Sequence, residues 1–210
     1  MNPWKIIGQH YHFECTQCGD CCRGDMQVEL SLYDLYKMAL FLKFNSTKEL
    51  FSNGYVYLQQ HPQGVWMPNL RFKTYPAKFC PFLINEADDQ QYWRGLCSLH
   101  PHAKPLVCAL SPVGRVLDFD ASQDDYVFVK PTEDCPGLDS QKKNLLSDIK
   151  TAYRKELVYQ ERFFRILQGL KSAGHDRTFY LTNLYVFDVR QPFEAILSRI
   201  EQKCHAEQCR

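Results

Sequence analysis

The chain has 210 residues, of which 45% are hydrophobic and 14% aromatic, so it can bury a core and is not a disordered chain. Its net charge of +1 gives no electrostatic attraction for nucleic acid or for an anionic membrane surface. No apolar run approaches the roughly 20 residues of a membrane span or resembles a secretory signal, so we expect a soluble, cytoplasmic protein.

The first predicted element is an extended segment over residues 10–13, directly before a group of cysteines. A helix is predicted over 32–43, because Ser31 and Asp34 stand at the spacing of a capping box and an apolar stripe follows. A second, shorter helix is expected between residues 46 and 54.

Residues 55 to 130 read as short strands joined by turns. Hydrophobic and aromatic segments alternate there with Pro, Gly and Asp, which favour turns. The predicted strand pairs are 55–58 with 65–67, 79–84 with 91–93, and 113–119 with 126–129. Short strands that return repeatedly to one place would bring cysteines from distant parts of the chain together.

The last third of the chain has a helical pattern. One long helix is predicted over 141–171, and a final helix from Pro192 to about residue 204, whereas residues 178–189 are ambiguous. The apolar face of the long helix is a core-facing surface. It consists of Ile149, Tyr153, Leu157, Phe164 and Leu167.

These elements predict a single α+β domain over residues 1–210. A strand-and-turn region that carries the cysteines covers about 11–138, and a helical part covers about 139–210. We expect the helices, above all the long one, to wrap the cysteine-bearing region.

Ten cysteines are the most informative feature of the composition. Disulfides rarely persist in a reducing cytosol, where clustered thiols are more often metal ligands. Four of the cysteines lie within eight residues, as two overlapping C-x-x-C pairs that end in a vicinal pair: Cys15, Cys18, Cys21 and Cys22. A C-x-x-C pair can turn both thiolates toward one soft metal ion.

Four later cysteines each lie at a turn or strand end with Pro or Gly close by, which lets backbone N–H groups point at the sulfur atoms. The predicted metal ligands are therefore Cys15, Cys18, Cys21, Cys22, Cys80, Cys97, Cys108 and Cys135. Successive side chains of an extended backbone point to opposite sides, so the vicinal pair suggests two centres or two metals of one cluster.

Eight thiolates exceed the four that one structural zinc ion requires, which favours an iron–sulfur cluster or another iron centre over zinc. The C-x2-C-x2-C run with a remote Cys-Pro is ferredoxin-like, although the complete ferredoxin pattern is not met. Zinc remains the alternative.

The cysteine run resembles the YkgJ-type cysteine-cluster family of bacteria, described as a zinc- or iron-chelating domain. The resemblance rests on Phe13-x-Cys-x-x-Cys-Gly-x-Cys-Cys-Arg23, on the helix start at 28–34, on Cys80-Pro-Phe-Leu83, on the block 97–115 and on Cys135-Pro-Gly137. It covers about residues 11–170 and implies that all eight cysteines are ligands. Lys104 stands where the family usually has Arg, and the interval from Cys97 to Cys108 is longer than expected. Flagellin lysine N-methylases carry a related cluster with a longer C-terminal part.

Several other residues are weaker candidates. Cys204 and Cys209 could bind an ion with His205, but fraying thiols at the chain end are the simpler expectation. His10 and His12 could approach the cluster, and His100 and His102 could hydrogen-bond near Cys97. We interpret Asp20 and Asp25 as turn formers, whereas Arg23 and Arg115 are either surface residues or a balance for thiolate charge.

The sequence leaves three functions open. The first is a metal centre with an exchangeable position for chemistry or electron transfer. The second is a structural zinc module that binds a partner protein, and the third is a methyltransferase that uses S-adenosylmethionine. No Ser/His/Asp set, paired carboxylates or Gly-rich nucleotide loop assigns an enzymatic reaction.

Overall fold

The structure is a computed structural model that describes residues 5–24, 26–75, 77–87, 89, 93–116, 125–171 and 173–208. The helices are α1 Leu32–Phe41, α2 Lys48–Ser52, α3 Leu106–Leu110, α4 Leu146–Ala152, α5 Arg154–Leu170, α6 Arg177–Tyr180 and α7 Phe193–Gln208. Short 3-10 turns form η1 Asp20–Cys22 and η2 Pro136–Asp139, and a π-helical turn forms η3 Leu181–Tyr185. None of the described helices combines the length and apolar character needed to cross a membrane.

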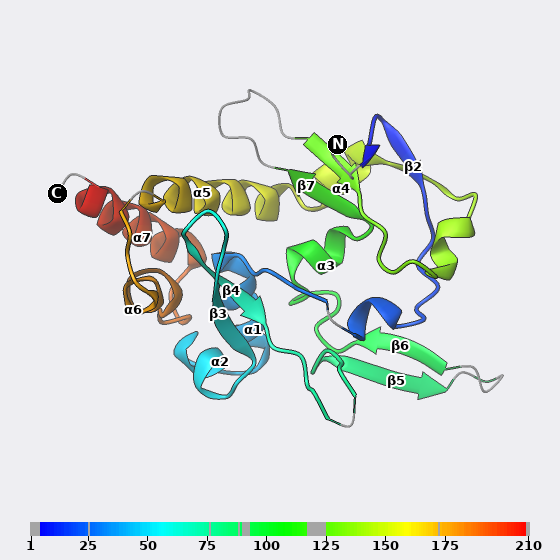
Figure 1. Ribbon diagram of the computed structural model, residues 1–210, viewed down its shortest axis with the longest axis horizontal. Helices are drawn as coiled ribbons and strands as arrows, with labels where there is room; N and C mark the ends of the chain where they lie inside the picture. Colours follow the sequence, from blue (N-terminus) through cyan, green and yellow to red (C-terminus); the bar gives the residue numbers. More distant parts are fainter. Residues whose placement is uncertain are drawn as a thin grey trace.

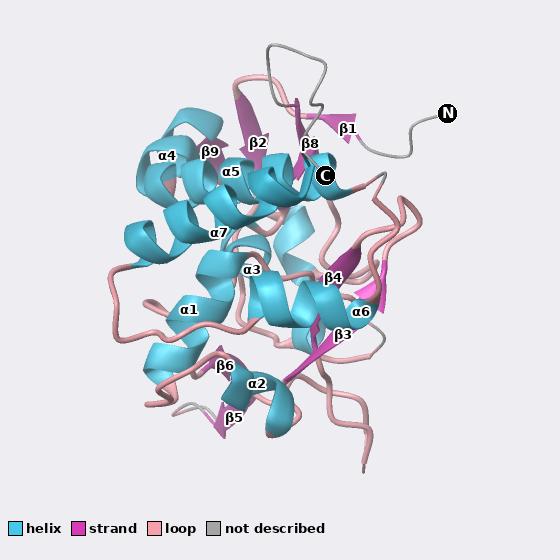
Figure 2. Cartoon of the chain, turned by 90° about the vertical axis from the view of Figure 1, so that its left-hand side faces the viewer, coloured by secondary structure: helices cyan, strands magenta, loops and turns pink. Residues whose placement is uncertain are grey.

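The strands are β1 Lys5–Ile6, β2 His10–His12, β3 Val56–Gln60, β4 Trp66–Leu70, β5 Leu83–Ala87, β6 Trp93–Cys97, β7 Val113–Val116, β8 Asp125–Phe128 and β9 Lys143–Leu145. All are paired antiparallel, in one three-stranded sheet (β1-β8-β7) and three two-stranded sheets (β2-β9, β3-β4 and β5-β6). The fold is therefore α+β, as the sequence predicts. Helices α5 and α7 lie side by side at one end of the molecule, and the β5–β6 hairpin projects at the other (Figures 1 and 2).

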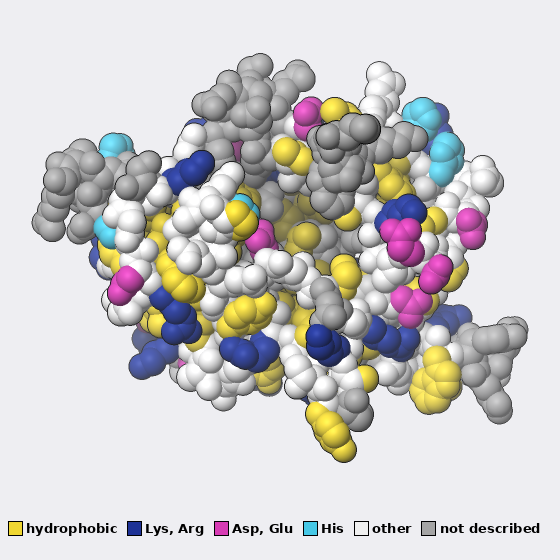
Figure 3. Space-filling view, in the orientation of Figure 1, with side chains coloured by type: hydrophobic (Ala, Val, Ile, Leu, Met, Phe, Trp, Pro, Cys, Tyr) yellow, Lys and Arg dark blue, Asp and Glu magenta, His cyan; other side chains and the backbone are white. Residues whose placement is uncertain are grey.

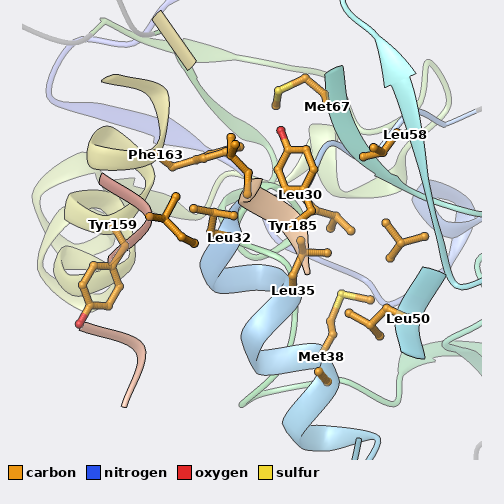
Figure 4. Packing of buried hydrophobic residues seen from close by; sticks show 14 of the residues in the cluster. Leu30, Leu32, Leu35, Met38, Leu50, Leu58, Met67, Tyr159, Phe163 and Tyr185 are labelled. Atoms are coloured by element: carbon orange, nitrogen blue, oxygen red, sulfur yellow. The ribbon is translucent and has the colours of Figure 1, made fainter. Parts of the chain in front are cut away.

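The main hydrophobic core forms around α1. Leu32, Leu35 and Met38 project from this helix into a cluster with side chains from β3, β4, α5 and α7 (Figure 4). Helix α1 begins with the predicted capping box: the Ser31 hydroxyl accepts from the Asp34 N–H (3.2 Å), and the Asp34 carboxylate accepts from the Ser31 N–H (2.8 Å). The box fixes where the helix starts and so which face it buries.

A second, smaller core lies under the three-stranded sheet. Leu106 and Leu110 of α3 pack there against Val113, Tyr126 and Leu157. Cys108, on the same short helix, packs instead against the main core. Helix α3 thus lies between the two cores, and its cysteine points away from the smaller one.

The predicted helix over 141–171 is wrong in its first part. Residues Lys143–Leu145 form strand β9, paired with β2, and the Asn144 side chain donates to the Phe13 carbonyl at 2.7 Å. The helical stretch that follows is interrupted at Tyr153 (φ −108°, ψ 18°), which separates α4 from α5. A pairing partner 131–135 residues earlier in the chain overrides the local helical pattern here.

The other predicted elements are found with shifted ends. The three strand pairs form as β3–β4, β5–β6 and β7–β8, although parts of the predicted second and third pairs, 91–92 and 117–119, lie outside the described residues. The final helix continues to Gln208, past the predicted end. The ambiguous stretch is helical, through α6 and η3, as far as Tyr185.

Candidate metal centre

The vicinal cysteines lie in a tight 3-10 turn rather than in an extended segment. Gly19, at φ 78°, precedes the turn η1, and the sulfur atoms of Cys21 and Cys22 are 4.0 Å apart. The prediction that they point to opposite sides is therefore wrong, because a 3-10 turn spaces successive side chains by only about 120°. A tetrahedral zinc site with Zn–S bonds of about 2.3 Å has sulfur atoms about 3.8 Å apart, so both could serve one ion.

Cys80 is held beside the same turn by the backbone. Its N–H donates to the Cys22 carbonyl at 2.8 Å, and an antiparallel bridge pairs Arg23 with Phe79. The thiols of Cys22 and Cys80 also perturb each other's pKa. The contact with Cys22, more than any other, lowers the pKa of Cys80.

Cys97 and Cys108 complete the group from two further elements. Cys97 ends strand β6, and Cys108 lies in the middle of α3. Charge on Cys97 acts on the thiols of Cys22 and Cys80, and charge on Cys108 acts on the thiol of Cys80. Charge on Cys22 in turn raises the pKa of Cys108. We refer to these side chains as the five-thiol cluster: Cys21, Cys22, Cys80, Cys97 and Cys108.

The cluster has a shortage of positive charge. Removal from water raises the pKa of Cys108 to about 12. The contact with Cys21 lowers the pKa of Cys22, but the contact with Cys80 and burial outweigh it and raise that pKa to about 11. Lys104 opposes the shift at both Cys21 and Cys108. A metal cation would stabilise the thiolates much more strongly than one lysine does.

Five sulfur donors fit zinc or iron, which bind thiolates, and do not fit magnesium or calcium, which prefer oxygen. In the parts of the chain that the structure describes, no three His, Cys, Asp or Glu side chains are arranged to hold an ion as they stand. Closure around a metal therefore requires thiol side chains to rotate toward one another.

Cys15, Cys18 and Cys135 lie in the flanking segments. The Glu14 N–H donates to the Gly137 carbonyl at 3.2 Å, which brings the chain at Cys15 beside the chain that follows Cys135. Cys15 is exposed and Cys135 is buried. Burial raises the pKa of Cys18, whose thiol contacts Asp20.

Two glycines lie in close contact with the cysteine turn, residues 15–22, or with Glu14 just before it. The Gly95 N–H donates to the Gln17 carbonyl at 2.6 Å, and a Cβ atom at Gly95 would lie 2.3 Å from the Gly19 Cα. A Cβ atom at Gly137 would lie 2.3 Å from the Glu14 carbonyl oxygen. Any larger residue at either position would separate the segments that carry the thiols.

Residues 14–136 match the model of a family named CxxCxxCC and described as a "putative zinc- or iron-chelating domain". The chain belongs to this family. No curated protein and no solved structure matches the chain. Membership of the CxxCxxCC family supports metal binding in general, and the matched range includes the whole five-thiol cluster.

The arginines of this CxxCxxCC chain have partners other than the cluster. Arg23 donates to Asp20 (3.1 Å) and to Asn85 (2.9 Å). Arg115 donates to the Leu157 carbonyl of α5 at 2.8 Å. Lys104 is a described cation whose charge opposes the raised pKa values of Cys21 and Cys108, at the position where the sequence resemblance implies arginine.

The four candidate histidines near the cysteines lie on the surface. His10 and His12 are exposed on β2, and His100 and His102 are exposed in the turn after β6. A backbone hydrogen bond from the His100 N–H to the Cys97 carbonyl (3.0 Å) connects this turn to the cluster.

The prediction that Cys204 frays at the chain end is wrong. Its side chain is 2% exposed and packs in the main core. Burial raises the pKa of the nearby Tyr180 and Tyr185, and the charge of Cys204 adds to both shifts. His205 beside it is exposed. Cys209 and Asp25 lie outside the described residues, and the nine described cysteines form no disulfide with one another.

Sequence reasoning missed a buried charged group next to the centre, made by Asp34, Lys37 and Glu156. Asp34 is 2% exposed and Lys37 is 9% exposed. The available signal was their position: both fall on the face of helix α1 that also carries Leu35 and Met38. Charged residues on an apolar helix face indicate buried partners.

Proposed function

We propose that this protein binds a metal centre through the five-thiol cluster. The supporting observation is the convergence of thiols from four separate elements: η1, the segment before β5, the end of β6, and α3. The pKa values of Cys21, Cys22 and Cys108 are raised, which is the expected electrostatic state of an ion-binding thiolate set that lacks its cation.

The preferred occupant is an iron–sulfur or other iron centre, and zinc is the alternative. Five thiols exceed the four of a closed zinc tetrahedron, and Cys15, Cys18 and Cys135 lie in the adjoining segments. An iron centre would supply one-electron chemistry, whereas zinc would be structural. Cys21 is exposed, so the centre would have one side open to solvent and to exchangeable ligands.

The molecular surface seen in the orientation of Figure 1 carries charges of both signs. The face drawn in Figure 3 carries Lys and Arg side chains as well as Asp and Glu side chains, in keeping with the net charge of +1. A net charge near zero does not favour a polyanionic partner. The proposed partners are therefore the metal, small ligands of the metal, or a redox partner.

The test is the metal content and visible spectrum of protein purified without oxygen. The wild-type protein should carry iron with acid-labile sulfide, or zinc, at a fixed stoichiometry. Cys80→Ser and Cys108→Ser should lose it. Cys204→Ser is the matched control, because Cys204 is a buried thiol outside the cluster, and it should retain the metal.

Two results would overturn the proposal. One is wild-type protein that contains no stoichiometric metal and takes up none on anaerobic reconstitution. The other is equal metal content in the wild type and in the Cys80 and Cys108 variants.

A further inference from the structure

A group of buried charges connects helix α1 to the segment that carries Cys108. The Lys37 ammonium donates to the Lys104 carbonyl at 2.9 Å, forms an ion pair with Glu156, and lies 3.5 Å from the Asp34 carboxylate. These three acceptors match the three N–H donors of a lysine. Lys37 therefore holds one point of the chain just before α3.

Asp34 holds a second point, at the start of α3. One carboxylate oxygen accepts from the Leu106 N–H at 2.9 Å, and the other accepts from the Ser31 hydroxyl at 2.7 Å. The residue that precedes α3 is Pro105, whose side chain offers no capping acceptor. Asp34 thus acts as the N-terminal cap of α3 from another helix.

Helix α3 depends on such support because it has only five residues. A helix of this length is not stable by itself in water, so its position is set by tertiary contacts. The contacts at Lys104 and Leu106 fix the chain within four residues of Cys108. They also fix the backbone of Lys104, whose charge acts on the thiols of Cys21 and Cys108.

We propose that Asp34 and Lys37 are positioning residues of the metal centre: by holding the Lys104 carbonyl and the Leu106 N–H, they place the Cys108 sulfur and the Lys104 ammonium toward the cysteine turn. This inference rests on the proposed function. The two residues do not contact the metal; they act through α3.

The presence of charged side chains at the buried positions 34 and 37 supports a role in positioning α3. Burying carboxylates and an ammonium group is costly, and apolar side chains of similar volume often stabilise a fold as well. Burial raises the pKa of Glu156, which shows the cost, and Lys37 partly offsets it. Directional contacts to a carbonyl and an N–H are something that apolar side chains could not supply.

The test is titration of the metal-free, reduced full-length protein with Co²⁺, whose thiolate charge-transfer absorption reports sulfur coordination. Lys37→Met removes the ammonium and keeps the chain length. We expect it to weaken Co²⁺ binding by about 10- to 100-fold, as is typical for groups that orient metal ligands, and to reduce the charge-transfer intensity per bound cobalt.

Arg162→Met is the matched control. Arg162 lies on α5, as Glu156 does, and it donates two hydrogen bonds to Glu201 of α7 (2.8 and 2.6 Å). It is remote from α3 in the chain. Its loss should lower stability and leave the affinity and the spectrum unchanged. The double variant Lys37→Met/Glu156→Gln removes both charges of the ion pair and leaves no unpaired charge at Glu156, so we expect it to fold. It still lacks the Lys37 ammonium and should bind Co²⁺ weakly.

Wild-type affinity and spectrum in both Lys37 variants would overturn the inference and leave the proposed function in place. Equal weakening in Arg162→Met would also overturn it, because the effect would then follow general stability. Absence of any charge-transfer band in the wild-type protein would instead refute the proposed function and the inference together.

Discussion

Replacing Gly95 by alanine should push the cysteine turn away from strand β6. The new Cβ atom would lie 2.3 Å from the Gly19 Cα, 2.7 Å from the Gly19 nitrogen and 3.2 Å from the Cys18 carbonyl carbon, where ordinary contacts are 3.4–4 Å. All three atoms belong to the backbone, so no side chain can rotate to relieve the overlap. The two segments must therefore move apart by about 1 Å.

The expected cost follows from that displacement. Overpacking of this kind typically lowers the free energy of unfolding by about 1–3 kcal/mol. For a chain of this size, such a change lowers the melting temperature by about 2–12 °C. The shift also stretches the hydrogen bond from the Gly95 N–H to the Gln17 carbonyl, so Cys18 and Cys21 should leave the positions that the metal centre requires.

Thermal unfolding and metal content measured on the same sample check this prediction. Gly8→Ala is the control, because no atom lies within 4 Å of a Cβ built at Gly8. It should melt as the wild type does and bind metal normally. The reasoning is refuted if Gly95→Ala has the wild-type melting temperature and the wild-type metal content.

Three further predictions concern the same architecture. Gly137→Ala should cost about 1–3 kcal/mol, because its Cβ would lie 2.3 Å from the Glu14 carbonyl oxygen, and chemical denaturation measures the loss. Metal binding should release protons and should tighten as pH rises above 7. The reason is that Cys22 and Cys108, with pKa values of about 11 and 12, are protonated in the metal-free protein. Calorimetry in buffers of different ionisation enthalpy counts the released protons. Ser31→Ala should lower the melting temperature by about 2–4 °C through loss of the α1 cap, at a cost of about 1 kcal/mol.

Each of these has a clear contrary result. A Gly137→Ala protein with unchanged stability would mean that the segment at Glu14 is not held as described. Metal affinity that is independent of pH between 6 and 8 would mean that the thiols are already ionised. A Ser31→Ala protein that melts with the wild type would mean that the capping box contributes nothing.

The local signals in the sequence were sufficient for much of the fold. The capping box at Ser31 and the turn between β3 and β4 are encoded in neighbouring residues, so both could be predicted. Strand β9 could not, because its extended form depends on pairing with β2, far away in the chain. The break between α4 and α5 at Tyr153 could not be predicted either, because neither proline nor glycine stands at this position.

The cysteine set itself could be proposed from spacing, but its arrangement could not. The vicinal pair was expected to be extended, and the 3-10 turn after Gly19 brings its sulfur atoms to 4.0 Å. The position of Cys204 near the chain end predicts a frayed thiol, yet helix α7 packs it into the core. The roles of Asp34 and Lys37 depend on which atoms of α3 they meet, which a residue pattern does not contain.

X-ray absorption at the edge of the bound metal, measured on protein purified without oxygen, identifies the ligand atoms of the metal centre. We expect a first coordination shell dominated by sulfur at about 2.3 Å, with fewer sulfur ligands in Cys80→Ser. A shell of nitrogen and oxygen at about 2.0–2.2 Å, unchanged in that variant, would contradict it.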